Sequence, residues 1–211
     1  MVSRVTYRPF EDSDFNDIAK ILQTAWHTQA PTPGYGFLEA CCDLADVLAI
    51  SSFSQVALID GKPSGIVLTR GGHVHRRMAA RWSVATEDFT RQIRASEPEA
   101  AERFLAMNQR VKEVNTAMLD ATTLPKGYEI TLLIVGENAR GLGIGSVLLD
   151  AATSYLVAHG AKKAFLYTDA DCDWKFYEHR GYQRMNTYRA ARSERKLLPR
   201  ELYLYGMDLT S

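Results

Sequence analysis

The sequence predicts an α/β (α+β) fold, a central β-sheet with helices on its faces, and three observations lead to this prediction. Residues 55–70 hold two short apolar runs around Asp60-Gly61, which is a strong β-hairpin signal. Residues 128–135, YEITLLIV, are nearly continuous in apolar and β-favouring residues, which is typical of a strand covered on both faces. A glycine-rich corner and an amphipathic helix follow that strand directly.

The first 50 residues predict one strand and two helices. Residues 5–10, VTYRPF, alternate apolar and polar side chains as a strand does, and Asp12 or Ser13 can cap the helix that follows. The apolar face of that helix comprises Phe15, Ile18, Ile21, Leu22, Ala25 and Trp26. Prolines and glycines in residues 30–36 end it. The second helix has an apolar face made of Phe37, Cys41, Leu44 and Leu48.

Residues 71–127 have little strand character, and their second half predicts a long helix. Ser96-Glu97-Pro98-Glu99 is a capping box with proline in the permissive first turn, so the helix should begin there. Its narrow apolar stripe comprises Phe104, Met107, Val111, Val114 and Met118. Such a stripe packs either on the core or on another chain, so a homodimer is one of the two arrangements that it predicts.

The last part of the chain predicts a helix, a strand, a short helix and two final strands. The apolar face of the helix after the glycine corner comprises Ile144, Val147, Leu148, Ala151, Ala152, Tyr155 and Leu156. Gly160 ends this helix. The later elements are a strand at residues 164–169, a helix at 173–180 closed by Gly181, and strands at 185–190 and 201–209. Without repeats or low-complexity segments, one domain over residues 1–211 is the simplest prediction.

Composition excludes several classes of function. The 25 basic and 25 acidic residues balance, so no broad charge favours binding to nucleic acid or to an anionic membrane. Neither a signal peptide nor a membrane-spanning segment is apparent, and we expect a soluble, cytoplasmic protein. Cys41, Cys42 and Cys172 lack metal-ligand spacing, and His73 and His75 have no cysteine or carboxylate near them in sequence. We therefore expect reduced thiols and no metal.

The glycine corner, ARGLGIG, places Gly141, Gly143 and Gly145 at alternate positions behind Arg140. Backbone N–H groups in the first turn of a helix have no intrahelical acceptor and lie at the positive end of the helix dipole. Glycines at this point let an anion such as a diphosphate approach several amides. A tight turn with close packing is the alternative. The spacing does not fit the G-x-G-x-x-G of a dinucleotide-binding fold, and the Gly-Lys-Ser/Thr of a nucleotide P-loop is absent.

Arg140, Gly143 and Gly145 match the Q/R-x-x-G-x-G/A signature, by which the chain resembles the GNAT superfamily of N-acetyltransferases. ITLLIVGENARGLGIGSVLLDAA is similar to the family's acyl-CoA-binding strand, loop and helix, FYEHRGY to its F-Y-E-x-x-G-F segment, and VALIDGKPSGIVL to its second and third strands. The resemblance implies a mixed, mostly antiparallel sheet flanked by helices, with a helical insert at about residues 71–127 between strands 3 and 4. One departure is Ala170, where many members carry asparagine.

The resemblance also implies acetyl-CoA as co-substrate and assigns roles to residues. Glu129, eleven residues before Arg140, matches the general base, and Tyr177 matches the acid that protonates the leaving thiolate. The residues implied to bind acetyl-CoA are Leu133, Ile134, Val135, Arg140, Gly141, Leu142, Gly143, Ile144, Gly145 and Ser146. A main-chain N–H near Ile134 or Val135, where family members splay or bulge this strand, would polarise the thioester carbonyl. A solvated Glu129 and a packed Tyr177 are the structural alternatives.

The expected function is transfer of an acetyl group from acetyl-CoA to a primary amine of a small molecule or peptide, by direct attack in a ternary complex. An acyl-CoA-binding sensor without turnover is the alternative, and a dinucleotide-dependent oxidoreductase is disfavoured by the glycine spacing. We expect residues 30–36 and 71–127 to form the acceptor wall. For the arginines from Arg76 to Arg94 we expect a solvated face, and an acidic-substrate site is the alternative. We also expect a solvated basic loop, with recognition of an acidic acceptor or of a CoA phosphate as the alternative. Its basic residues are Arg192, Arg195, Lys196 and Arg200.

Overall fold

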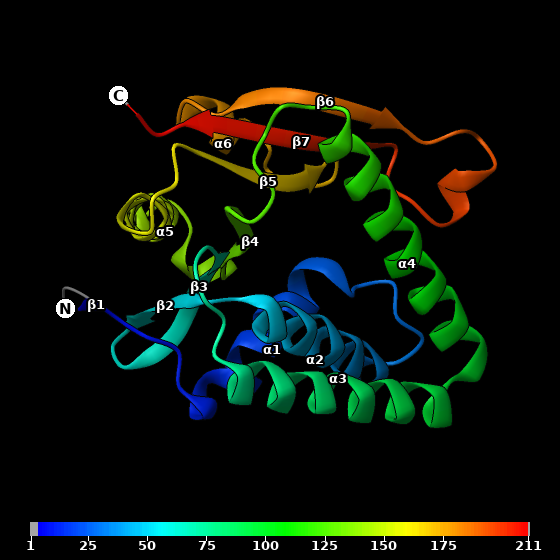
Figure 1. Ribbon diagram of the computed structural model, residues 1–211. Helices are drawn as coiled ribbons and strands as arrows, with labels where there is room; N and C mark the ends of the chain where they lie inside the picture. Colours follow the sequence, from blue (N-terminus) through cyan, green and yellow to red (C-terminus); the bar gives the residue numbers. More distant parts are fainter. Residues whose placement is uncertain (1–3, 211) are drawn as a thin grey trace.

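The computed structural model describes residues 4–210 and contains a seven-stranded sheet in the order β1-β2-β3-β4-β5-β7-β6 (Figure 1). The strands are β1 (Val5–Arg8), β2 (Phe53–Ile59), β3 (Lys62–Arg70), β4 (Glu129–Val135), β5 (Lys163–Asp169), β6 (Gln183–Arg189) and β7 (Glu201–Asp208). Neighbouring strands are antiparallel apart from β4 and β5, which are parallel. The predicted mixed, mostly antiparallel sheet is therefore confirmed.

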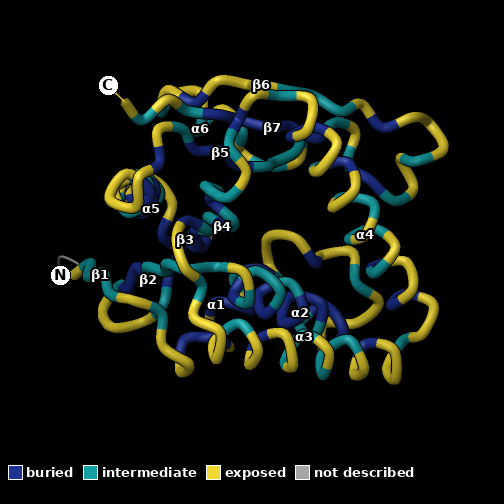
Figure 2. The backbone as a smooth tube through the Cα atoms, in the orientation of Figure 1, coloured by how far each residue is buried: buried dark blue, intermediate teal, exposed yellow. Residues whose placement is uncertain are grey.

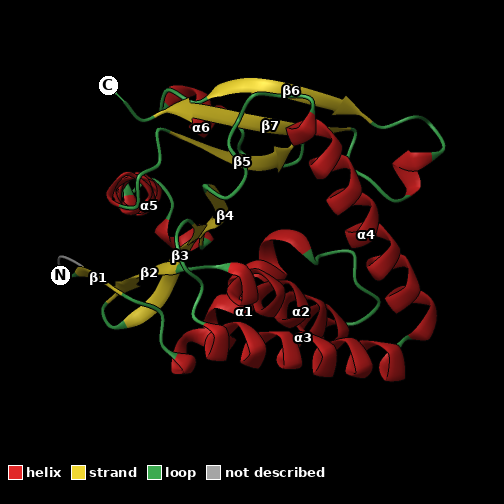
Figure 3. Cartoon of the chain, viewed as in Figure 1, coloured by secondary structure: helices red, strands yellow, loops and turns green. Residues whose placement is uncertain are grey.

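Helices cover both faces of this sheet (Figure 3). They are α1 (Phe15–Trp26), α2 (Pro33–Ile50), α3 (Arg76–Ser96), α4 (Pro98–Asp120), α5 (Ile144–Ala158) and α6 (Lys175–His179). In Figure 1, α5 lies on one side of the molecule, and α4 crosses on the other side from the end of α3 to β6 and β7. Within residues 4–210, no helix combines the length and apolar character needed to cross a membrane.

The two faces of the sheet bury different helices, because successive side chains on a strand point to opposite sides. On β3, Ile66 and Leu68 pack with α1 and α2, whereas Val67 packs with α5. On β5, Phe165 packs in a cluster with α4, whereas Leu166 lies on the α5 face. Figure 2 shows the buried residues concentrated on the sheet and on the helix faces that contact it.

The predicted helical insert between the third and fourth strands is confirmed, and it consists of two helices. Helix α3 was not predicted, although Trp82, Phe89 and Ile93 follow helical spacing along it. The Trp82 ring stacks on Phe15 of α1 at a centroid distance of 5.1 Å. Helix α3 therefore covers the core that α1 and α2 form against the sheet. As predicted, all its arginines are exposed.

The capping box predicted for the next helix is wrong. Ser96 is the last residue of α3, and α4 begins at Pro98 after the junction residue Glu97. Proline lacks the N–H that would continue α3 and is well tolerated as a first helical residue. The apolar stripe of α4 is covered within the chain, since Phe104 packs in a cluster with α2 and α3 while Val114 packs with β5 and β7.

Details of α1, α2 and α5 differ from expectation. Ala25 and Trp26 do not face the core, and Trp26 is 46% exposed. Ala25 instead lines an open hollow beside the end of α1. Helix α2 begins at Pro33, because the Thr32 hydroxyl accepts a hydrogen bond from the Tyr35 N–H at 3.1 Å and caps the helix. Residues 30–36 are therefore partly helical. In α5, Val147 is also exposed.

Candidate active site

Strand β4 is paired on one side only along most of its length. It pairs with β3 from Glu129 to Val135, but with β5 only at Glu129 and Ile130. From Thr131 onward its edge toward β5 has no strand partner among residues 4–210, and the two strands diverge (Figure 3). Leu133, Ile134 and Val135, the strand residues predicted to bind acetyl-CoA, lie on this free edge.

A β-bulge lies within the same strand, at Thr131. The register with β3 shifts between Leu68 and Thr69, which oppose Leu132 and Ile130, so Thr131 is the extra residue. We expected a splay or bulge near Ile134. The splay includes that residue, whereas the bulge lies three residues earlier. The Thr131 hydroxyl is 2.9 Å from the Ser51 hydroxyl at the end of α2, which anchors the bulge.

The glycine corner forms a tight loop that exposes backbone amides. Gly141 and Gly143 have φ angles of 76° and 74°, and an added Cβ at either would meet no atom within 4 Å, so conformation rather than crowding requires glycine here. Within residues 4–210, the N–H groups from Gly141 to Gly145 donate to no backbone carbonyl. The Ser146 N–H donates to Gly143 O, so the free amides end at Gly145. The Ile144 side chain is buried, leaving only its backbone facing the loop.

A hollow of about 280 Å³ adjoins this corner. The end of β4 and the following loop, from Val135 to Arg140, line one side, and the last turns of α1, from Lys20 to Ala25, line the other. The free edge of β4, the free amides and this hollow therefore adjoin one another at the carboxyl end of β4.

Glu129 lies at the start of β4 on the sheet face that carries α4, because it pairs in register with Phe165 of β5. Its side chain is 12% exposed, and one oxygen, Oε2, accepts a hydrogen bond from Nη2 of Arg70 at 2.6 Å. Burial raises the pKa of Glu129, and the charge and hydrogen bond of Arg70 oppose that rise without cancelling it. Tyr167 lies two residues after Phe165, on the same face of β5. Burial raises the pKa of Tyr167, and the nearby Glu129 carboxylate raises it further.

Tyr177 lies on the opposite face, in α6. Its ring packs in T-shaped contacts with Phe176 and Tyr182, at centroid distances of 5.4 Å and 6.0 Å. Burial raises the pKa of its phenol, which therefore stays protonated at neutral pH. An added Cβ on Gly145 would lie 3.6 Å from the Phe176 ring, so the glycine corner and α6 border one another. Tyr177 and Glu129 thus lie on opposite faces of the sheet, and Glu129 lies where β4 and β5 begin to diverge.

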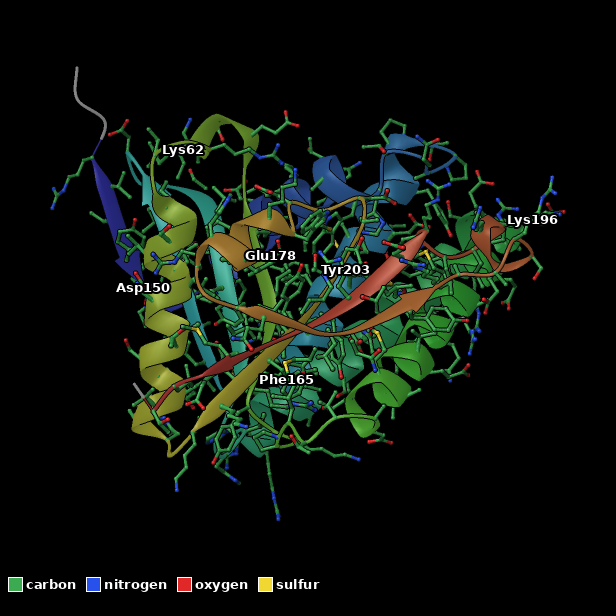
Figure 4. The ribbon with its side chains drawn as sticks, turned by 90° about the horizontal axis from the view of Figure 1, so that it is seen from above. Lys62, Asp150, Phe165, Glu178, Lys196 and Tyr203 are labelled. Carbon is green, nitrogen blue, oxygen red and sulfur yellow. The ribbon has the colours of Figure 1, made fainter. Side chains whose placement is uncertain are left out.

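Other candidate residues lie elsewhere. His73 and His75 are exposed in the loop before α3, not on a strand. Among residues 4–210, no group of three or more histidine, cysteine, aspartate or glutamate residues is placed to hold a metal ion. Burial raises the pKa of Cys172 to about 12, which disfavours a reactive thiolate. The four basic loop residues are exposed, and Lys196 lies on the far side of the molecule from Asp150 of α5 (Figure 4).

The family model described as the Acetyltransferase (GNAT) family matches residues 15–182, which is well over half of the chain. The chain belongs to this family. It is accordingly an acyltransferase, as the sequence analysis expected. No curated protein sequence is significantly similar to it.

Solved structures show the same GNAT fold. Ard1 from Thermoplasma volcanium is 16% identical, with a TM-score of 0.55 and coverage of 98% of this chain and 99% of that chain. A putative phosphinothricin N-acetyltransferase is 14% identical, with a TM-score of 0.57 and coverage of 99% and 100%. Arabidopsis thaliana Naa50, in complex with the bisubstrate analogue CoA-Ac-MVNAL, is 16% identical, with a TM-score of 0.53 and coverage of 97% and 98%.

Two residues beside Glu129 were missed by the sequence analysis of this GNAT chain. Arg70 and Tyr167 lie 59 and 38 positions away from it in the sequence, and neither belongs to a family motif that we identified. They meet Glu129 because β3 and β5 flank β4. No local pattern could have indicated this contact, since it depends on the strand order and on the register.

Proposed function

We propose that the protein transfers an acetyl group from acetyl-CoA to a primary amine of a small molecule or peptide, by direct attack in a ternary complex. The observation that carries this proposal is the free edge of β4, which begins beside Glu129 and ends at the exposed amides of the glycine corner. A thioester substrate with a diphosphate at its other end fits such an arrangement.

The two parts of acetyl-CoA would occupy different parts of the site. The diphosphate would accept hydrogen bonds from the amides between Gly141 and Gly145, at the positive end of the α5 dipole, with Arg140 adding charge. The amide-containing pantetheine arm would add to the free edge of β4, as an extra strand pairs with an exposed sheet edge. A backbone N–H of Leu133, Ile134 or Val135 would then polarise the thioester carbonyl.

The chemistry requires one base and one acid. The amine nitrogen attacks the carbonyl carbon, a C–N bond forms, and the C–S bond to CoA breaks. Glu129 accepts the proton that the amine loses, directly or through a water molecule, and its raised pKa makes it a stronger base than a solvated carboxylate. Tyr177 donates a proton to the departing thiolate, so that the products are the acetylated amine and CoA.

The names of two structural relatives suggest acceptor amines to test. One relative is Naa50 bound to an analogue that joins CoA to the peptide MVNAL, and another is a putative phosphinothricin N-acetyltransferase. The peptide MVNAL and phosphinothricin therefore represent the two acceptor classes in the proposal. Residues 30–36, which include the start of α2, and the insert at residues 71–127, whose helix α4 lies on the Glu129 face, would form the acceptor wall.

An acyl-CoA-binding protein without turnover is the second candidate. It is favoured by the hydrogen bond that Arg70 donates to Glu129, because this bond occupies one oxygen of the proposed base. Calorimetric titration with acetyl-CoA, followed by a thiol-release assay with MVNAL, phosphinothricin and a panel of simple amines, separates the two. We expect binding and release, with Glu129→Gln and Tyr177→Phe lowering kcat more than acetyl-CoA affinity. Binding without release on every amine would favour the sensor, and no binding would contradict both functions.

A further inference from the structure

We infer that Arg70 is a positioning residue of the transferase site, and that it orients the carboxylate of Glu129 for proton transfer from the acceptor amine. This inference rests on the proposed function. It concerns a residue outside the glycine corner and outside the strand that carries the base.

The β-bulge at Thr131 creates the pairing. With an uninterrupted register from Leu68 opposite Leu132, Arg70 would oppose Ile130, and the Glu129 side chain would point to the α5 face. The extra residue shifts the register by one, so that Arg70 opposes Glu129 and both side chains lie on the α4 face. Directly opposed residues of an antiparallel pair have Cβ atoms about 5 Å apart, which suits a direct ion pair. The backbone irregularity thus brings the guanidinium to the carboxylate.

The contact leaves half of the carboxylate available. Nη2 of Arg70 donates to Oε2 of Glu129 at 2.6 Å, whereas Oε1 accepts no hydrogen bond from residues 4–210. Arg70 is 39% exposed, and its buried Nε has no hydrogen-bond partner among the described residues. The pair therefore fixes one oxygen and leaves the other free to accept a proton, directly or through water.

A purely structural ion pair of this protein looks different. Arg8 and Asp14 have the same shortest N–O distance, 2.6 Å, but Arg8 uses both Nη atoms, one on each carboxylate oxygen. The Glu11 N–H also donates to Asp14, so both of its oxygens are engaged. Asp14 is 3% exposed and lies by β1, at the edge of the sheet. This pair is a matched control, because it joins an arginine to a buried carboxylate away from the parted strands.

Electrostatics gives Arg70 a second effect on the base. Burial favours the neutral carboxyl and raises the pKa of Glu129, whereas Arg70 favours the charged form. Among residues 4–210, Arg70 is the charged group that shifts the pKa of Glu129. The phenol of Tyr167 faces the pair from β5, and Asp120 at the end of α4 raises the pKa of that phenol. Removing Arg70 should therefore raise the pKa of Glu129 further.

The direct test is a carboxyl titration by NMR of full-length protein with 13C-labelled glutamate. The Glu129→Gln variant identifies the signal, and the wild type, Arg70→Gln, Arg70→Lys and the control Arg8→Gln are compared. We expect the Glu129 titration to move upward in Arg70→Gln, to return toward the wild-type value in Arg70→Lys, and to stay unchanged in Arg8→Gln. This measurement needs no acceptor amine. An unchanged titration in Arg70→Gln would overturn the inference.

The pH profile of kcat, measured by thiol release with the best amine of the panel, tests the role in transfer. In Arg70→Gln the acid limb should move to higher pH, with activity recovering at high pH. If Glu129→Gln lowers kcat but the limb does not move in Arg70→Gln, the positioning role fails and the proposed function stands. Full kcat in Glu129→Gln would instead contradict the proposed base. Thermal unfolding checks that all variants are folded.

Discussion

The buried His27 should make the stability of this protein depend on pH. His27 ends α1, and its imidazole lies between two carboxylates of α2, with Nδ1 3.1 Å from Oε2 of Glu39 and Nε2 3.2 Å from Oδ2 of Asp43. The second contact is an ion pair without hydrogen-bond alignment. The Asn108 amide of α4 donates to the other oxygen of Asp43 at 3.0 Å, so the cluster joins three helices.

The size of the effect follows from the pKa of His27. Burial disfavours the charged imidazole, but Asp43 and Glu39 outweigh burial and raise the pKa from 6.5 to about 9. The native protein therefore binds this proton more tightly than the unfolded chain does. The resulting stabilisation, about 3 kcal/mol, is complete below pH 6.5 and is lost as the pH rises through 9.

Urea unfolding of the wild type and His27→Gln, at several pH values from 6.5 to 9, measures this contribution. We expect the difference in unfolding free energy between the two proteins to shrink by most of the stabilisation of about 3 kcal/mol as the pH rises from 6.5 to 9. Cys41 and Cys42 also lower the stability at high pH, because burial raises the pKa of each thiol to about 12 in the native state while the unfolded thiols ionise. This effect is the same in both proteins and cancels when their unfolding free energies are subtracted. Parallel pH profiles for the two proteins would refute the reasoning.

Two further predictions concern the glycine corner and α3. Gly145→Ala should weaken acetyl-CoA binding in calorimetry without lowering Tm, because its position is helical, whereas Gly143→Ala should also lower stability by about 1 kcal/mol, since its φ is 74°. Equal acetyl-CoA affinity of wild type and both variants would show that the glycines serve the turn alone. Trp82→Ala should lower the unfolding free energy by about 3 to 5 kcal/mol, whereas Val84→Ala, on the exposed side of the same helix, should have little effect. Similar losses in both variants would mean that α3 does not cover the core.

The local elements of this fold were largely predictable. The hairpin turn at Asp60-Gly61, the strand that begins at Glu129 and the helix that follows the glycine corner are confirmed nearly at the predicted bounds. Each depends on side-chain periodicity or turn residues within a few positions, so the signal is present in the sequence. Helix α3 was missed although Trp82, Phe89 and Ile93 recur at helical spacing, because polar and charged residues outnumber the apolar ones along it.

The sequence by itself determined the type and order of the elements other than α3, the glycine corner and the family signature. Only the tertiary structure decided that β4 separates from β5 after Ile130, that a bulge at Thr131 places Arg70 opposite Glu129, and that α4 crosses to β6 and β7. The physical reason is that register and strand order depend on contacts between residues far apart in the chain. A one-residue shift leaves the local sequence pattern unchanged but exchanges every side chain that the neighbouring strand meets.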